Sequence, residues 1–161
     1  MDKKSIRHSA IDEIAFLLQY RARTISEIEK KLAEKGYSEE DIELGISKAV
    51  EHGWLNDAKY AERLIESAQS GTVKGKKGIV YKLKQKGVAD EIIQEAMEGV
   101  DDRDELKKAE GVALNIYRNR IMERRKLNDR LWRGLAARGF EYDIISRAID
   151  RVLTDWTDED D

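Results

Sequence analysis

Residues 28–42, with the sequence IEKKLAEKGYSEEDI, decide the fold of this chain. Ile28 and Leu32 stand eight and four residues before Gly36, so they lie on one side of a helix that ends at the glycine. Ser38 follows with the spacing of a capping box, in which a side chain accepts an amide at the start of a helix. The stretch therefore predicts two helices separated by a glycine stop.

The same pattern recurs along the chain. Gly36, Gly87 and Gly139 are 51 and 52 residues apart. Apolar residues stand eight and four residues before each glycine, six and ten residues after it, and 26 residues before it: Ile28, Ile79 and Leu131; Leu32, Leu83 and Leu135; Ile42, Ile93 and Ile145; Ile46, Met97 and Ile149; Ala10, Ala61 and Ala113. Because chance rarely aligns so many positions, we interpret the chain as three tandem copies of one unit.

The spacing of apolar residues follows the helical period almost throughout, and no strictly alternating stretch is long enough to predict a strand. We therefore predict an all-α fold of three tandem three-helix repeats in an elongated, curved array. The repeats are placed at residues 9–53, 57–100 and 105–153, followed by an acidic tail at residues 154–161. Because a unit of about 50 residues is marginal alone, each repeat is expected to share core with its neighbours.

Several side chains are candidates for capping helix starts, where backbone amides lack partners. The capping-box candidates are Ser26 with Glu29, Ser38 with Asp41, and Asp102 with Glu105. Either Asn56 or Asp57, and also Asn128, are candidates for single caps.

The composition favours a helical protein without covalent cross-links. Of the 161 residues, 39 % are charged, and the chain has neither Cys nor Pro. Disulfides and thiolate metal sites are therefore excluded. No run approaches the ~20 apolar residues of a membrane span, and residues 1–5 do not begin an apolar signal peptide. We expect a cytoplasmic protein that is monomeric and has no membrane contact.

The sequence contains no constellation of residues that specifies catalysis. His8 and His52 are far apart and belong to no paired motif, so a histidine metal site or a Ser–His pair is not predicted. The glycine-containing residues 71–78 fail the phosphate-loop pattern, because Ser70 stands at its first glycine and Lys77 at its hydroxyl position. We therefore predict no enzyme activity, no catalytic residue, no metal and no cofactor.

Basic residues concentrate in the second and third repeats, although the net charge is −3. In the second repeat the basic segment, residues 74–86, carries Lys74, Lys76, Lys77, Lys82, Lys84 and Lys86 and no acid. In the third repeat the basic residues are Arg118, Arg120, Arg124, Arg125, Lys126, Arg130, Arg133 and Arg138. The corresponding helix of the first repeat mixes acids with bases. Local patches of this kind attract phosphates whatever the total charge of the chain.

The two basic segments predict a groove that binds an anionic polymer or filament. Arginine, which dominates the third repeat's segment, binds a phosphate or carboxylate through two hydrogen bonds at once. Tyr81, Tyr117 and Trp132 lie among the cations, where they either stack on bases or pack. The alternative is a solvated charged surface without a partner. Contact with six to ten phosphates would make binding ~10³–10⁵-fold weaker between low and moderate salt.

Residues 155–161 carry five acids and no base. One interpretation is a disordered, solubilising segment. The other is a mimic of nucleic-acid phosphates that folds back over the basic residues.

The order of several motifs resembles the RecX regulatory proteins of bacteria. The motifs are Ser26-Glu27-Ile28-Glu29-x-x-Leu32-x-x-Lys35-Gly36, Gly53-Trp54-Leu55-Asn56-Asp57-x-x-Tyr60-Ala61, Leu83-x-x-Lys86-Gly87-Val88, Arg125-Lys126-Leu127, and Leu135-x-x-Arg138-Gly139-Phe140-x-Tyr142-Asp143-Ile144-Ile145. The resemblance spans residues 9–153. The sequence departs from the family at Asn56, where members often carry an acid, and in the glycine-rich link at residues 71–78.

The resemblance implies a three-repeat, all-helical regulator that is not an enzyme. Members of the family bind the RecA recombinase filament on single-stranded DNA, inhibit its ATPase and strand exchange, and promote its disassembly. The cations of the second and third repeats would then meet DNA phosphates or acidic groups of RecA. The more acidic first repeat would meet a basic filament surface. The resemblance thus implies a role in DNA repair, recombination and the SOS response, with weak binding to single-stranded DNA alone.

Two other functions are compatible with the sequence. A direct DNA-binding protein, such as a transcription regulator, would use its three-helix units on duplex DNA without RecA. A scaffold would bind an acidic protein through the same basic residues.

Overall fold

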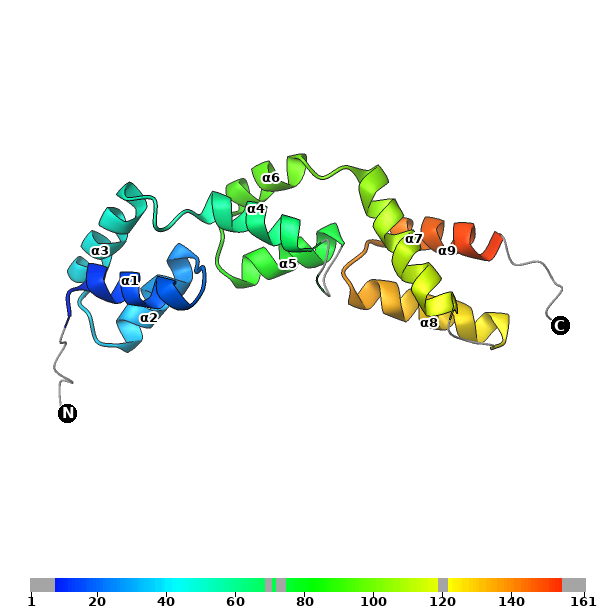
Figure 1. Ribbon diagram of the computed structural model, residues 1–161, viewed down its shortest axis with the longest axis horizontal. Coiled ribbons are helices and arrows are strands. Elements are labelled where there is room, and N and C mark those ends of the chain that lie inside the picture. The colour runs from blue at the N-terminus through cyan, green and yellow to red at the C-terminus, as the bar shows by residue number, and fades with distance from the viewer. Residues whose placement is uncertain (1–7, 69–70, 72–74, 119–121, 155–161) are drawn as a thin grey trace. The chain divides into compact units, whose positions relative to one another are not determined.

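The structure is a computed structural model that describes residues 8–68, 71, 75–118 and 122–154. Across these residues the chain forms nine α-helices and no strand (Figure 1). The helices are α1 (Ala10–Tyr20), α2 (Ile25–Glu34), α3 (Glu39–Glu51), α4 (Asp57–Ser67), α5 (Lys76–Gln85), α6 (Asp90–Glu98), α7 (Asp102–Arg118), α8 (Arg124–Ala137) and α9 (Tyr142–Thr154). The predicted all-α fold of tandem three-helix repeats is confirmed.

The chain divides into two compact units. The first comprises residues 1–63 and 83–94, and the second comprises residues 64–82 and 95–161. The division runs through the second repeat, because α4, α5 and α6 each contribute residues to both units.

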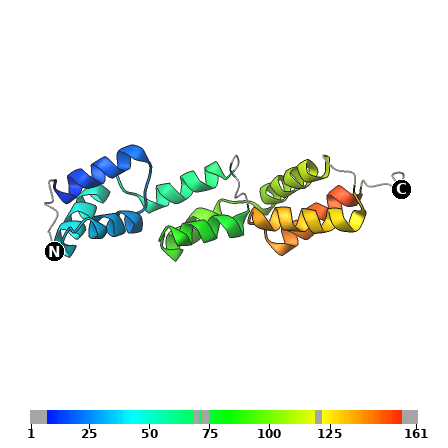
Figure 2. The same ribbon diagram turned by 90° about the horizontal axis from the view of Figure 1, so that it is seen from below.

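The core of the first unit forms where α1, α2 and α3 pack together (Figure 2). Ile14 of α1 and the two α2 residues Ile28 and Leu32 are fully buried, as the spacing from Gly36 predicts. Leu55, in the joint after α3, is also buried against them. The apolar residues at fixed spacings from Gly36 therefore form the core of this three-helix bundle.

The core of the second unit lies among α7, α8 and α9. Leu131 and Leu135 of α8 are fully buried, and so is Ala113 of α7, at the positions that the repeat predicts. Ile145 and Ile149 of α9 complete the same layer. The third copy of the pattern thus buries the positions that the first copy buries, and it also buries Ile145 and Ile149, whose counterparts Ile42 and Ile46 are only half-buried.

The repeat glycines end their helices as predicted. Gly36, Gly87 and Gly139 have φ angles of 89°, 76° and 80°, which L-residues with a Cβ rarely adopt. The amides that follow them, of Tyr37, Val88 and Phe140, donate to the carbonyls of Leu32, Leu83 and Leu135. Each copy therefore closes its second helix with the same hydrogen bond.

The capping box of α2 differs from the prediction. Thr24, and not Ser26, is the N-cap, and its hydroxyl accepts the amide of Glu27 at 3.2 Å. The Glu27 carboxylate accepts the Thr24 amide at 3.1 Å in return. The prediction of Ser26 with Glu29 was wrong because the same spacing of hydroxyl and acid also occurs two residues earlier, and Ser26 lies within α2.

Two of the other helix starts agree with the prediction. Ser38 caps α3 by accepting the amide of Asp41 at 3.2 Å. Of the two candidates before α4, Asn56 caps the helix by accepting the amide of Lys59 at 3.0 Å. Asp57 has a different role, described below.

Two predicted caps are wrong. At α7 the carboxylate of Asp101, one residue before Asp102, accepts the amide of Arg103 at 3.0 Å. Asn128 lies inside α8, because that helix begins one turn earlier, at Arg124. The Asp102 cap was wrong because a second acid, Asp101, stands one residue before it. The Asn128 cap was wrong because the cations that precede it already belong to the helix.

Successive repeats meet through one kind of junction. In the first unit the Thr24 hydroxyl donates to the Lys86 carbonyl at 2.6 Å. In the second unit the Gly75 amide donates to the Arg138 carbonyl at 3.0 Å. Thr24 and Gly75 are 51 residues apart and Lys86 and Arg138 are 52 residues apart, as the repeat requires. The start of one second helix therefore abuts the end of the next repeat's second helix.

A buried carboxylate completes each junction. Asp57, at the start of α4, accepts the amide of Ile25 at 3.0 Å. Glu105, in α7, accepts the amide of Lys76 at 2.8 Å. Each acid thus caps the second helix of the preceding repeat, where backbone amides would otherwise lack partners. The neighbouring repeats supply hydrogen-bond partners to one another.

Candidate nucleic-acid interface

The start of α8 gathers positive charge. Arg124, Arg125 and Lys126 occupy its first turn, which contains no acid, and the N-cap Glu123 makes no side-chain capping bond. A helix N-terminus carries a partial positive charge, which disfavours cations and attracts anions. The three side chains therefore add to the helix potential instead of neutralising it.

The same arginines border an open cavity in the second unit. Arg124, Arg125 and Asn128 of α8 line it on one side, and Ile149, Asp150, Leu153 and Thr154 of α9 line it on the other. Its volume is about 650 Å³. Asp150 is the single acid among the described residues of this lining. The cavity thus combines an apolar wall with two exposed guanidinium groups, a lining suited to an anionic group that also has an apolar part.

Eight of the predicted interface cations make no ion pair with another described residue, and six of these also make no side-chain hydrogen bond within the described chain. These six are Lys77, Lys82, Arg118, Arg124, Arg125 and Arg130. All are exposed except Arg130, which is half-buried. Because no acid among the described residues pairs with them, these groups remain able to bind an external anion.

Four predicted cations are paired with acids. Lys76 pairs with Asp102, Lys84 with Asp90 at 3.9 Å, Lys86 with Glu27 at 2.8 Å, and Lys126 with Glu123 at 3.5 Å. The hydrogen bond that Lys76 donates to the Asp102 carboxylate raises the pKa of Lys76. Lys76 and Lys86 belong to the two junctions between repeats, so their ammonium groups serve the fold.

The remaining described arginines bind their own helix. Arg133 donates from Nε to the carbonyl of Asp129 at 3.3 Å, and Arg138 donates from Nη1 to the carbonyl of Gly134 at 2.8 Å. Both keep further N–H donors, because a guanidinium has five. Lys74, Arg120 and the acidic residues 155–161 lie outside the described residues.

The aromatic side chains near the cations differ in their surroundings. The ring of Trp132 lies 4.9 Å from that of Tyr142, and Tyr117 packs against the core of the third repeat. Trp132 and Tyr117 therefore pack against other side chains, which is one of the two roles that the sequence left open. Tyr81 is 63 % exposed on α5.

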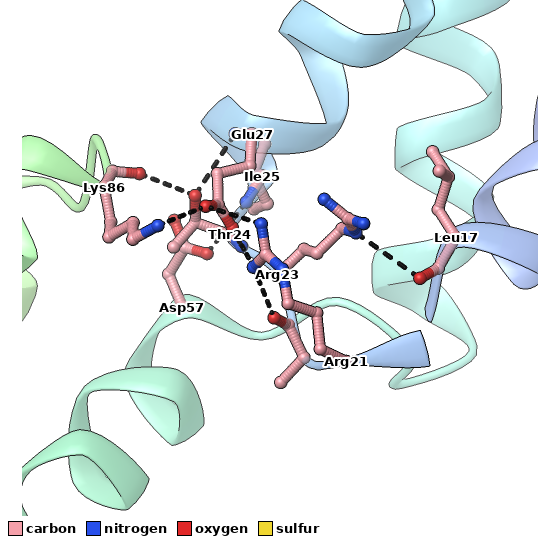
Figure 3. A network of polar contacts seen from close by, with 9 residues as sticks. Leu17, Arg21, Arg23, Thr24, Ile25, Glu27, Asp57 and Lys86 are labelled. Carbon is pink, nitrogen blue, oxygen red and sulfur yellow. Dashed lines mark hydrogen bonds and ion pairs between the residues drawn. The ribbon is translucent and has the colours of Figure 1, made fainter. Parts of the chain in front are cut away.

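The first junction fixes a charged carboxylate between two cations (Figure 3). Glu27 accepts hydrogen bonds from Arg21 at 3.1 Å and from Lys86 at 2.8 Å. Burial works to raise the pKa of Glu27, but the hydrogen bonds from Arg21, Lys86 and the Thr24 amide outweigh it and lower the pKa to about 2. The carboxylate is therefore charged at neutral pH and holds the junction.

The first unit holds a second group of cations that was not predicted from the sequence. Arg23, Lys59 and Arg63 line a cavity of about 210 Å³ together with Trp54 and Tyr60. The four-residue spacing of Lys59 and Arg63 on one helix was a signal that could have found it.

The described residues contain no group of three or more His, Cys, Asp or Glu side chains placed to hold a metal ion. None of the helices that the structure describes is long and apolar enough to cross a membrane.

Comparison with known proteins identifies the family. Residues 15–44 match the family model described as RecX, first three-helix domain, and residues 56–97 match RecX, second three-helix domain. Regulatory protein RecX of Clostridium perfringens is 33 % identical over 133 residues, which cover 81 % of this chain and 62 % of that protein. The chain thus spans about three fifths of the length of the Clostridium perfringens relative.

Two further comparisons extend the match. Regulatory protein RecX of Mycolicibacterium smegmatis is 32 % identical over 139 residues, which cover 81 % of this chain and 74 % of that protein. The crystal structure of RecX from Lactobacillus salivarius superposes with a TM-score of 0.78 at 27 % identity, covering 89 % of this chain and 94 % of that chain. Fold and sequence thus agree over most of the chain, and it belongs to the RecX family, whose matched members are named regulatory proteins.

Proposed function

We propose that this chain binds the RecA filament on single-stranded DNA and inhibits its ATPase and strand exchange, and so regulates DNA repair and recombination. Membership of the RecX family supports the choice of partner. The arginines at the start of α8, which pair with no described acid and lie beside an open cavity, support a contact with phosphates or acidic groups. We expect the chain to act as a cytoplasmic monomer, without cofactor or metal.

The proposed mechanism is a shift in the balance between states of the filament. Arg124, Arg125 and Arg130 bind phosphates of the DNA or carboxylates of RecA, and the acids of the first repeat bind basic filament surface. A ligand moves an equilibrium only as far as its affinities for the two states differ. Inhibition therefore requires that these contacts fit the inactive state of the filament better than the active one.

The test is RecA ATPase on single-stranded DNA, titrated with this chain at two salt concentrations. We expect inhibition that saturates with the chain and requires more of it at the higher salt, because cations that replace counterions bind less tightly as salt rises. An ATPase rate that the chain leaves unchanged at both salt concentrations would refute the proposal.

A second candidate is direct binding to DNA without RecA, as a transcription regulator. The basic first turn of α8 favours it, because this turn lacks the acids that would repel a phosphate backbone. Sequence-dependent binding to duplex DNA in the absence of RecA, together with unaffected RecA ATPase, would establish this function in place of the first.

A further inference from the structure

A basic, aromatic cavity lies in the first unit, where α1 ends and α4 begins. Arg23, Lys59 and Arg63 line it together with the rings of Trp54 and Tyr60, and no Asp or Glu belongs to the described lining. Its volume of about 210 Å³ is smaller than the ~300–1,000 Å³ typical of pockets for whole small-molecule ligands. The space therefore suits one planar ring rather than an entire cofactor.

The end of α3 holds the backbone of Trp54 in place. Gly53 has a φ angle of 74°, which turns the chain out of the helix. The amide of Trp54 then donates to the carbonyl of Ala49 at 2.8 Å. The side chain is nevertheless 48 % exposed, although burial of an indole is strongly favourable. A fixed backbone and a half-exposed ring are what a stacking surface requires.

The three cations beside the ring are available to an anion. Arg23 donates from Nε to the carbonyl of Leu17 at 3.4 Å (Figure 3), which orients the guanidinium and leaves its terminal nitrogens unused by that bond. Lys59 and Arg63 stand one turn apart on α4 and make no ion pair with another described residue. Like charges at this spacing destabilise a helix slightly, and a bound anion would relieve that cost.

We propose that this cavity binds one nucleotide of a single-stranded nucleic acid. The base stacks on Trp54, and the flanking phosphates contact Arg23, Lys59 and Arg63. A duplex is disfavoured because its bases already have both faces covered, whereas an unpaired base can turn out and stack on an aromatic ring. The inference goes beyond the proposed function, because it gives the first unit its own contact with nucleic acid, whether or not RecA is the partner.

The first test removes the two α4 charges. Labelled oligo(dT) and oligo(U) are titrated with the full chain at low salt without RecA, and binding is followed by fluorescence anisotropy. The double variant Lys59→Gln, Arg63→Gln is compared with Lys30→Gln, Lys48→Gln, which removes the same charge from exposed positions of the same unit. We expect about tenfold weaker binding and a shallower salt dependence for the first variant only.

The second test removes the ring. Bases that stack on tryptophan quench its fluorescence, so oligo(dT) is expected to quench the wild-type chain and to quench Trp54→Ala much less. Trp54→Ala should weaken oligo(dT) binding about tenfold. It should leave binding of an abasic deoxyribose-phosphate oligomer unchanged, because that polymer has no base. Trp54→Phe, which keeps a ring, should bind within a fewfold of wild type, and circular dichroism checks that each variant remains helical.

Three results would overturn the inference. One is equal weakening by the two charge variants. Another is equal loss of oligo(dT) and abasic-polymer binding in Trp54→Ala. The third is displacement of oligo(dT) by polyglutamate at equal charge concentration, which would indicate a site for acidic peptides. RecA ATPase measured with the same variants separates the two proposals. If the chain inhibits RecA but its binding to oligo(dT) does not depend on the cavity residues, only the proposed function is retained. If oligo(dT) binding depends on the cavity residues but RecA is not inhibited, only this inference is retained.

Discussion

The hydroxyl of Thr24 donates a 2.6 Å hydrogen bond to the carbonyl oxygen of Lys86, 62 residues further along the chain. The same hydroxyl accepts the amide of Glu27 at 3.2 Å, so one side chain satisfies an orphan donor of α2 and an acceptor at the end of α5. Because the positive end of one helix meets the negative end of another, the dipoles also attract. The junction between repeats is therefore polar, yet it is internally satisfied.

Replacing this hydroxyl should weaken the first junction. Thr24 is fully buried, and Thr24→Val keeps its shape while leaving the part-buried Lys86 carbonyl and Glu27 amide without this partner. We expect the free energy of unfolding to fall by about 2–3 kcal/mol, measured by urea denaturation. Ser38→Ala removes only an exposed cap and should cost about 0.5–1 kcal/mol. Equal effects of the two changes would show that the bond to Lys86 contributes nothing.

The pKa of Glu27 predicts how stability changes in acid. Because the folded chain lowers this pKa from 4.5 to about 2, the stabilisation is fully present above pH 4.5 and is lost as the pH falls toward 2. We expect the urea midpoint of the wild type to fall over this interval, and that of Glu27→Gln to fall less. Parallel curves for the two proteins would show that another carboxylate carries the acid sensitivity.

The pKa of Glu105 is shifted in the opposite direction to that of Glu27. Burial raises its pKa, although the amide and the charge of Lys76 partly oppose the shift. Its charge therefore opposes folding at neutral pH, while its hydrogen bond to the Lys76 amide supports it. We expect Glu105→Gln, which keeps the acceptor, to be close to wild type in stability at pH 7. Glu105→Ala should cost about 1–3 kcal/mol, because the amide loses its partner. A large loss for both variants would show that the charge itself is required.

The second junction depends on a glycine. A Cβ at position 75 would stand 2.1 Å from the carbonyl oxygen of Gly139, so the two backbones could not keep their approach. We expect Gly75→Ala to lower the melting temperature by several degrees. Gly111→Ala, in the middle of α7 with open space around it, should raise stability by about 0.5–1 kcal/mol. If Gly75→Ala also raised it, the two segments would not be in contact in solution.

The core positions could be predicted from the sequence because two local rules determine them. The helical period selects which side chains face inward, and a glycine stop fixes the phase, so Ile28, Leu32 and Leu135 could be assigned to the core without knowing the packing. Helix starts were predicted less well, because Thr24 and Ser26 satisfy the same local pattern, and it is long-range bonds, from Thr24 to Lys86 and from Ile25 to Asp57, that favour the first.

The roles of the cations could not be predicted from local sequence. Lys86 was assigned to a binding surface, but its partner Glu27 lies 59 residues away in the neighbouring repeat. The cavity around Trp54 was missed for the same reason, because Arg23 and Lys59 come from segments whose overall charge is balanced. Spacing along the chain shows which residues share a helix, whereas these pairings depend on how repeats meet.

Reversing the charges of three α8 arginines should weaken the inhibition of RecA without destabilising the fold. Replacing Arg124, Arg125 and Arg130 with Glu places two acids in the first turn of the helix, where the dipole favours them by about 0.3–1 kcal/mol each. None of the three pairs with a described acid, so no ion pair among the described residues is lost. We therefore expect undiminished helicity and stability together with at least tenfold weaker inhibition of RecA ATPase. The same three changes should make inhibition less sensitive to salt, since fewer counterions are released when the chain binds. Inhibition that remained at wild-type strength would exclude these arginines from the interface and leave the contact to other residues of the chain.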